Sequence, residues 1–259
     1  MANGLDIATE WPEPVKHLLL SQILQRGGAY FTANQTFDFT SQAARDSLTE
    51  MVKWLQVHKV MFRQLIPQQN TSVPGRLAAG ATGYGWNNRA KPLSVMGYLG
   101  TWGLPSTTSQ LPDGSQWQYE FHTVPPMAGN EHKFVQNSGW AFAVPKTSRN
   151  QAVAWDVARS LALSPQAMRK WSAVTNALPA LRANGTPAAA AAHPSLGKVQ
   201  HLLEHGQWVG YIPAAASDAA LFALVNNFFA AAEGSKTVDE ALADMQKTAN
   251  GAIEQHRGK

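Results

Sequence analysis

The pattern of apolar and polar positions predicts an amino-terminal part with few strands and a carboxyl-terminal part made of helices. Apolar residues at helical spacing predict helices over 15–25 and 42–57. Gly27 and Gly28 end the first of these, and Thr40 or Ser41 can cap the second. Short apolar runs bounded by turn residues predict strands over 94–99, 119–124 and 140–145.

After residue 148 the predicted elements are all helices. They cover 151–163, 165–175, 195–205, 218–232 and 238–256. Thr237 and Glu240 have the spacing of a capping box and mark the start of the last one. Three tryptophans lie within periodic patterns and are predicted to belong to the core: Trp54, Trp155 and Trp171.

These elements indicate an α/β fold with extra helices packed on it. A parallel sheet needs more strands than the pattern shows. Either further strands escape the pattern, or part of the sheet is absent from the chain.

Composition excludes several classes of protein. Of the 259 residues 44% are hydrophobic, which argues against disorder. The net charge of +4 is scattered, so no basic stripe indicates a nucleic-acid partner. With no cysteine, the chain has no disulfide, thiolate zinc site, iron–sulfur cluster or cysteine nucleophile. The sequence shows no apolar run long enough to span a membrane and no signal-peptide pattern.

One local motif is compatible with metal chemistry. His201, Glu204 and His205 form an H-x-x-E-H pattern, in which two histidines four residues apart on a helix can bind zinc and the glutamate can activate water. No third ligand is evident, and Gly206 follows directly. A histidine at a helix end is also favoured by the helix dipole alone.

Tryptophans beside glycine or proline are the second candidate feature. Trp11, Trp86, Trp102 and Trp140 have such neighbours, unlike the tryptophans of the predicted helices. An indole face can stack on the apolar face of a sugar ring. By spacing alone, a core role and a binding role for these residues both stay open.

Three ordered stretches carry a family resemblance: 97–105, 124–180 and 237–247. They include Gly100-Thr-Trp-Gly103, Asn137-Ser-Gly-Trp140 followed by Ala-Phe-Ala-Val-Pro-Lys, and Thr237-Val-Asp-Glu-Ala-Leu242. In order and spacing they resemble the carbohydrate-binding extracellular solute-binding proteins (family 1) of bacterial ABC transporters, the maltose-binding-protein-like group.

The resemblance implies a type II periplasmic-binding-protein-like α/β fold that lacks the N-terminal part. Residues 1–140 would form the C-terminal-lobe segment, 141–182 the return into an incomplete N-terminal lobe, and 183–259 closing helices on the C-terminal lobe. Helices of 141–182 would then expose apolar surface, which favours self-association or a partner chain.

The resemblance also implies ligand-binding residues. Trp102 matches a tryptophan that stacks on the sugar, Trp11 lies near a cleft aromatic, and Gly139 and Trp140 match a segment at the cleft hinge. Thr101 departs from the usual proline. Residues 218–221 also lack the aromatic of maltose-type proteins, so a maltose-like stacking platform is not expected there.

The function implied is that of a substrate-binding component of an ABC importer for sugars or oligosaccharides, with no catalytic residue, metal or cofactor. Its partners would be the sugar and the transporter's membrane subunits, and its location periplasmic or extracellular, at the membrane. The isolated chain would bind ligand weakly or not at all. Two alternatives stay open: a zinc-dependent hydrolase using the motif at 201–205, and an interaction module without a small ligand.

Overall fold

The structure, a computed structural model, describes residues 3–6, 13–60, 94–97, 122, 133–136, 141–175, 206–208 and 214–257. The chain divides into two compact units. Unit 1 comprises 1–98, 124–136 and 206–259, and unit 2 comprises 99–123 and 137–205. This division does not test the three predicted segments 1–140, 141–182 and 183–259, which stay predictions.

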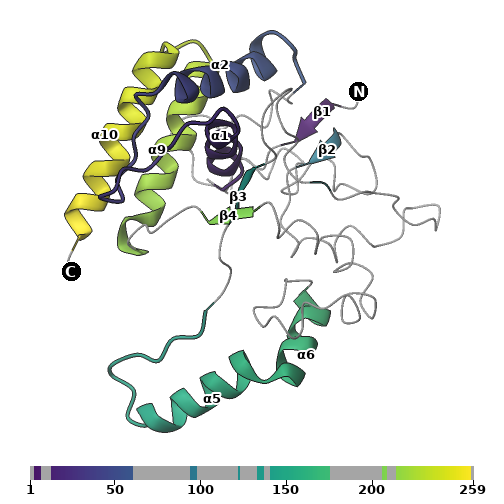
Figure 1. The fold of residues 1–259 in the computed structure, drawn as a ribbon, viewed down its shortest axis with the longest axis vertical. Helices are drawn as coiled ribbons and strands as arrows, with labels where there is room; N and C mark the ends of the chain where they lie inside the picture. Colours follow the sequence, from purple (N-terminus) through teal and green to yellow (C-terminus); the bar gives the residue numbers. More distant parts are fainter. Residues whose placement is uncertain are drawn as a thin grey trace, which may run out of the picture. The chain divides into compact units, whose positions relative to one another are not determined.

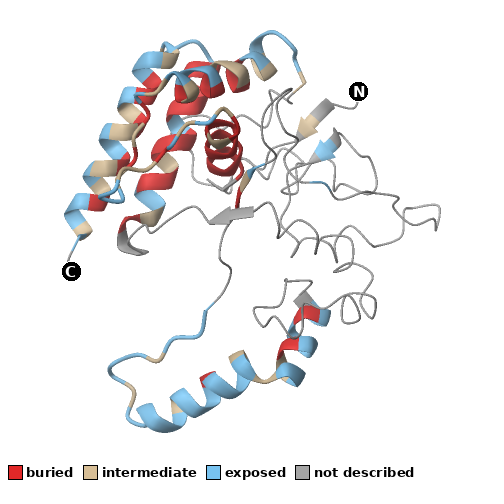
Figure 2. Ribbon diagram, in the orientation of Figure 1, coloured by how far each residue is buried: buried red, intermediate tan, exposed pale blue. Residues whose placement is uncertain are grey.

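Four helices form the described core of unit 1 (Figures 1 and 2). They are α1 (Glu13–Gln25), α2 (Gln42–Gln56), α9 (Ala214–Ala232) and α10 (Val238–His256). α9 and α10 pack along each other, and α1 contacts both α2 and α9. The largest fully buried side chains of this core are Leu19, Leu20, Ile23, Phe37, Leu48, Met51, Leu224, Phe228, Met245 and Ile253.

The described strands of unit 1 form two parallel pairs. β1 (Asn3–Asp6) pairs with β2 (Ser94–Gly97), and β3 (Phe134–Gln136) pairs with β4 (Gly206–Trp208). In unit 2 the described helices are α5 (Gln151–Leu163) and α6 (Pro165–Thr175), which contact each other.

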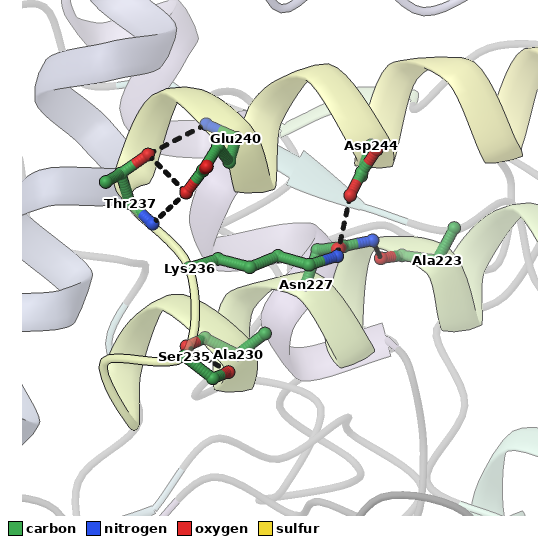
Figure 3. Close-up of polar contacts among 8 residues, drawn as sticks. All are labelled: Ala223, Asn227, Ala230, Ser235, Lys236, Thr237, Glu240 and Asp244. Carbon is green, nitrogen blue, oxygen red and sulfur yellow. Dashed lines mark hydrogen bonds and ion pairs between the residues drawn. The ribbon is translucent and has the colours of Figure 1, made fainter.

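Helix ends follow the predicted caps. The Ser41 side chain accepts a hydrogen bond from the Ala44 backbone N–H at 3.1 Å, and Thr237 and Glu240 form the capping box (Figure 3). Gly27 ends α1 with a φ of 74°, a conformation that glycine adopts without steric cost. The bonds at Ser41 and at Thr237 pair backbone N–H groups in the first turn, which have no partner within the helix.

A lysine joins α9 to α10. The Lys236 ammonium donates to Asn227 Oδ1 at 2.6 Å and to Asp244 Oδ2 at 2.7 Å (Figure 3). This hydrogen-bonded ion pair lowers the pKa of Asp244. The turn between the two helices is therefore held by a charged side chain as well as by apolar packing.

Residues 30–39 form an aromatic hairpin that lies on α10. Phe31 and Phe37 are bridged, and the Asn250 side chain accepts from the Phe37 N–H and donates to the Phe37 carbonyl, both at 2.8 Å. Gln246 Oε1 accepts from the Phe39 N–H at 2.7 Å. Side-chain amides one helical turn apart thus bond the hairpin backbone as a neighbouring strand would.

The helix predictions over 15–25, 42–57, 151–163, 165–175 and 238–256 are confirmed within two residues at each end. α9 begins at Ala214, four residues before the predicted start, because alanine continues a helix readily. The helix predicted over 195–205 lies outside the described residues.

The strand predicted over 94–99 is confirmed over 94–97 as β2, and residues 98 and 99 lie outside the described residues. The strand predicted over 140–145 is wrong in its described part. Residues 141–145 form no strand, and Phe142 among them is exposed. Apolar composition favours a strand there, but among the described strands none pairs with these residues. Of the strand predicted over 119–124, only His122 is described, and it is not in a strand.

Two predicted core tryptophans are exposed instead. Trp155 on α5 has an exposed fraction of 50% and Trp171 on α6 one of 40%. Trp54 on α2 packs against the core of unit 1, as predicted. Helical periodicity identified all three positions on helices, but it does not distinguish a buried helix face from an exposed one.

We expect Asn250→Ala to lower the free energy of unfolding by about 1–3 kcal/mol, because the Phe37 N–H and carbonyl lose their part-buried partner. Urea unfolding measures the change. Gln255→Ala, at an exposed site on the same helix, is the control and should change stability far less. Equal losses in both variants would contradict the role given to Asn250.

We also expect Tyr30 to give the stability a pH dependence. Burial raises the pKa of Tyr30 to about 12 from its usual 10.0, because the phenolate loses hydration. The stability from the buried neutral phenol is complete below pH 10 and is lost as the pH rises through about 12. Across that range, urea unfolding should show the wild type losing more stability than Tyr30→Phe. Parallel profiles would contradict the assignment.

Candidate ligand-binding edge

The predicted site residues Trp11, Trp102, Gly139 and Trp140 lie outside the described residues, as do His201, Glu204 and His205. The structure therefore tests none of them directly. It does describe the strands next to them in the sequence. Of these residues, Trp11 belongs to unit 1 and the others to unit 2.

Two of the tryptophans follow the same edge of one parallel pair. Asp6 pairs with Gly97 at the carboxyl ends of β1 and β2. Trp11 comes five residues after Asp6, and Trp102 comes five residues after Gly97. Because the strands are parallel, both segments leave from neighbouring points. In open α/β sheets this carboxyl edge is where ligands bind.

The β3–β4 pair lies between the tryptophan segment and the histidine motif in the sequence. β3 ends at Gln136, and Gly139 and Trp140 follow three and four residues later, after its carboxyl end. His205 directly precedes β4, whose first residue, Gly206, pairs with Phe134 at the amino ends of both strands. The two motifs are thus joined to opposite edges of this pair.

Two side-chain bonds set the direction of α1 against β3. Ser21 Oγ accepts from the Val135 N–H at 2.8 Å, and Gln25 Nε2 donates to the Lys133 carbonyl at 2.8 Å. The later helix residue meets the earlier strand residue, so α1 runs antiparallel to β3. Its amino-terminal end, two residues after Trp11, is therefore directed toward the carboxyl edge of β3.

The buried polar line of α1 is a feature that the sequence analysis missed. His17, Ser21 and Gln25 lie one turn apart on the same side of the helix and are all buried. Since Ser21 and Gln25 face β3, His17 is the member of the line nearest the carboxyl edge. Polar residues at positions i, i+4 and i+8 of an otherwise apolar helix were the available signal.

The described residues contain no group of three side chains that could hold a metal ion. In the same part of the chain, no helix has the length and apolarity needed to cross a membrane. The zinc hypothesis thus gains no support from the residues that the structure describes.

We expect Ser21→Ala to destabilise unit 1 by about 1–3 kcal/mol, because the buried Val135 N–H loses its acceptor. Thermal unfolding followed by circular dichroism measures the loss. Ser160→Ala is the matched control, because Ser160 is exposed on α5. If the two variants unfold alike, the Ser21 bond does not hold α1 on β3.

No protein-family profile and no curated protein matches the sequence. Solved structures do match the fold. A cyclic alpha-maltosyl-1,6-maltose binding protein from Arthrobacter globiformis has a TM-score of 0.64 and 16% identity over 98% of this chain. The maltose/maltodextrin-binding domain MalE from Bdellovibrio bacteriovorus, bound to maltotriose, has a TM-score of 0.60 and 15% identity over 98% of this chain. Maltose-bound T. maritima MalE3 has a TM-score of 0.65 and 15% identity over 96% of this chain.

The chain spans 60% of the length of each of these three proteins. At this identity the likeness concerns the fold. The α/β, helix-rich, periplasmic-binding-protein-like fold predicted from the sequence is therefore confirmed: the chain has the fold of maltose- and maltodextrin-binding proteins over nearly all of its length.

Proposed function

We propose that the chain is a non-catalytic sugar-binding protein, and that it serves as the substrate-binding component of an ABC importer for sugars or oligosaccharides. The fold likeness carries this proposal, because the three matched proteins bind maltose, maltotriose or a cyclic maltosyl-maltose. The importer role and a periplasmic or extracellular location rest on the motif resemblance.

The proposed ligand-binding residues are those that follow the carboxyl ends of described strands in the sequence. Trp11 and Trp102 follow paired strand ends, and Gly139 and Trp140 follow the end of β3. Indole rings attached to such an edge supply flat apolar faces for the C–H face of a pyranose. Three tryptophans in these connections therefore favour a sugar over an anionic ligand, for which basic residues would be expected.

Affinity is expected to be low for the chain alone. It has no counterpart to two-fifths of the length of the matched proteins, and ligand contacts from that part would be missing. Fewer contacts leave less binding free energy after the cost of fixing the ligand.

A thermal-shift titration with maltose, maltotriose and other mono- and oligosaccharides tests the proposal. Because a ligand that binds only the folded state raises the unfolding temperature, one sugar class should give a rise that grows with concentration. Zinc and a metal chelator are titrated in the same assay. A response to zinc alone, or none to any sugar up to about 50 mM, would contradict the proposal for this chain.

Trp102→Ala should weaken sugar binding about two- to thirteenfold, the loss expected for one stacking contact of about 0.5–1.5 kcal/mol. Isothermal titration calorimetry measures the affinity. Trp155→Ala is the matched control, because Trp155 is exposed on α5 and outside the proposed site. Equal affinities in the wild type and Trp102→Ala would remove Trp102 from the site.

A further inference from the structure

The two units differ in how they treat their apolar side chains. Of the ten large hydrophobic residues that are exposed in the described part of the chain, only Val57 and Met96 belong to unit 1, whose helices bury their apolar faces in a common core. The other eight, all in unit 2, are Phe142, Val153, Trp155, Val157, Leu161, Leu163, Trp171 and Val174. Exposed apolar side chains that gather on neighbouring helices mark a surface for interaction with another polypeptide.

α5 is apolar on more than one side. Val153, Val157 and Leu161 form one row along the helix, and at about 100° per residue Trp155 lies roughly 160° around the helix from Val153. All four side chains are exposed, and Figure 2 shows α5 coloured as exposed along almost its whole length. A helix that is apolar on several sides is a buried helix in folded proteins. A partner that meets α5 on one side covers only part of this surface, so its partner must pack around it.

The comparison with solved structures favours one partner of this kind. The three structures match 96–98% of this chain, yet the chain spans only 60% of their length. In each of them the matching part is therefore folded together with a further two-fifths of polypeptide. Unit 1 already buries its described helices, whereas α5 and α6 of unit 2 leave theirs exposed. Unit 2 is thus the unit from which packing partners are missing.

We propose that α5 and α6 are the docking surface for a polypeptide outside residues 1–259, which supplies the two-fifths of the matched fold that has no counterpart here. Its contact face is apolar, because the only charged side chains of α5, Asp156 and Arg159, form an ion pair with each other. The motif resemblance assigns the missing part to the amino-terminal side. The coding sequence immediately upstream of Met1 is therefore the source of the polypeptide to be tested.

Hydrogen–deuterium exchange of the 259-residue chain tests the docking, alone and after refolding from urea together with the upstream polypeptide. Alone, α5 and α6 should exchange within about tenfold of the unfolded rate, because short helices without packing are marginally stable. α9 and α10 should exchange at least roughly a thousandfold more slowly, because they are packed in the core of unit 1. With the upstream polypeptide, exchange in α5 and α6 should slow at least about a hundredfold.

A matched pair of variants locates the contact. Val157→Asp puts a carboxylate into the docking surface and should weaken the complex at least about tenfold, because the charge is buried there without a partner. Val57→Asp makes the same change at an exposed position in unit 1, at the end of α2, and should bind like the wild type. Fluorescence anisotropy of the labelled upstream polypeptide measures the affinities. Both positions are exposed, so circular dichroism of each isolated variant should match the wild type.

Three results would overturn the proposal. Slow exchange of α5 in the chain alone at every concentration would show that the chain covers the helix itself. Slow exchange that develops only as the chain is concentrated from about 5 to 100 µM would assign the surface to a second copy. Unchanged exchange of α5 and α6 in the presence of the upstream polypeptide would exclude that polypeptide as the partner. No sugar is present in these measurements, so the docking and the proposed function can fail separately.

Discussion

Burial of α1 is the constraint on which the arrangement of unit 1 depends. The helix contacts α2, α9 and β3, and its buried polar residues are Lys16, His17, Ser21, Gln22 and Gln25. Since a polar group taken out of water needs a partner, such a helix fits in few positions. The bonds from Ser21 and Gln25 to β3 join the helical layer to the strands and fix the direction of α1. The direction of α1 against β3 thus depends on two neutral side chains.

The bounds of the helices could be predicted from the sequence more accurately than those of the strands. α2 and α10 have wide apolar faces and explicit caps at Ser41 and Thr237, so their limits could be predicted within a residue or two. β3 and β4 have three residues each and pair across about seventy positions of the chain. A run that short cannot display alternation, and its pairing is determined by distant residues. The segment 141–145 shows the converse, because its apolar composition predicted a strand and the structure assigns none there.

The candidate site was predicted by motif, and the structure contributes the topology around it. Trp11, Trp102, Gly139 and Trp140 were identified without knowledge of β1 or β3, yet each follows the carboxyl end of a parallel strand. Periodicity failed in a different way at Trp155 and Trp171. It shows that a residue lies on a helix face, but it cannot show whether another layer covers that face. His17 was missed because polar residues at helical spacing also occur on solvent-facing sides of helices, and only the contact with β3 shows that this side is buried.

The bonds between α10 and residues 37–39 set the order in which unit 1 can assemble during synthesis. Phe37 and Phe39 leave the ribosome more than two hundred residues before Asn250 and Gln246. At about 5–20 residues per second, the hairpin waits roughly 10–40 s for its amide partners. Its aromatic side chains are accessible to other nascent chains throughout that interval. Completion of unit 1 therefore waits for the synthesis of α10, and until then the hairpin lacks these hydrogen-bond partners.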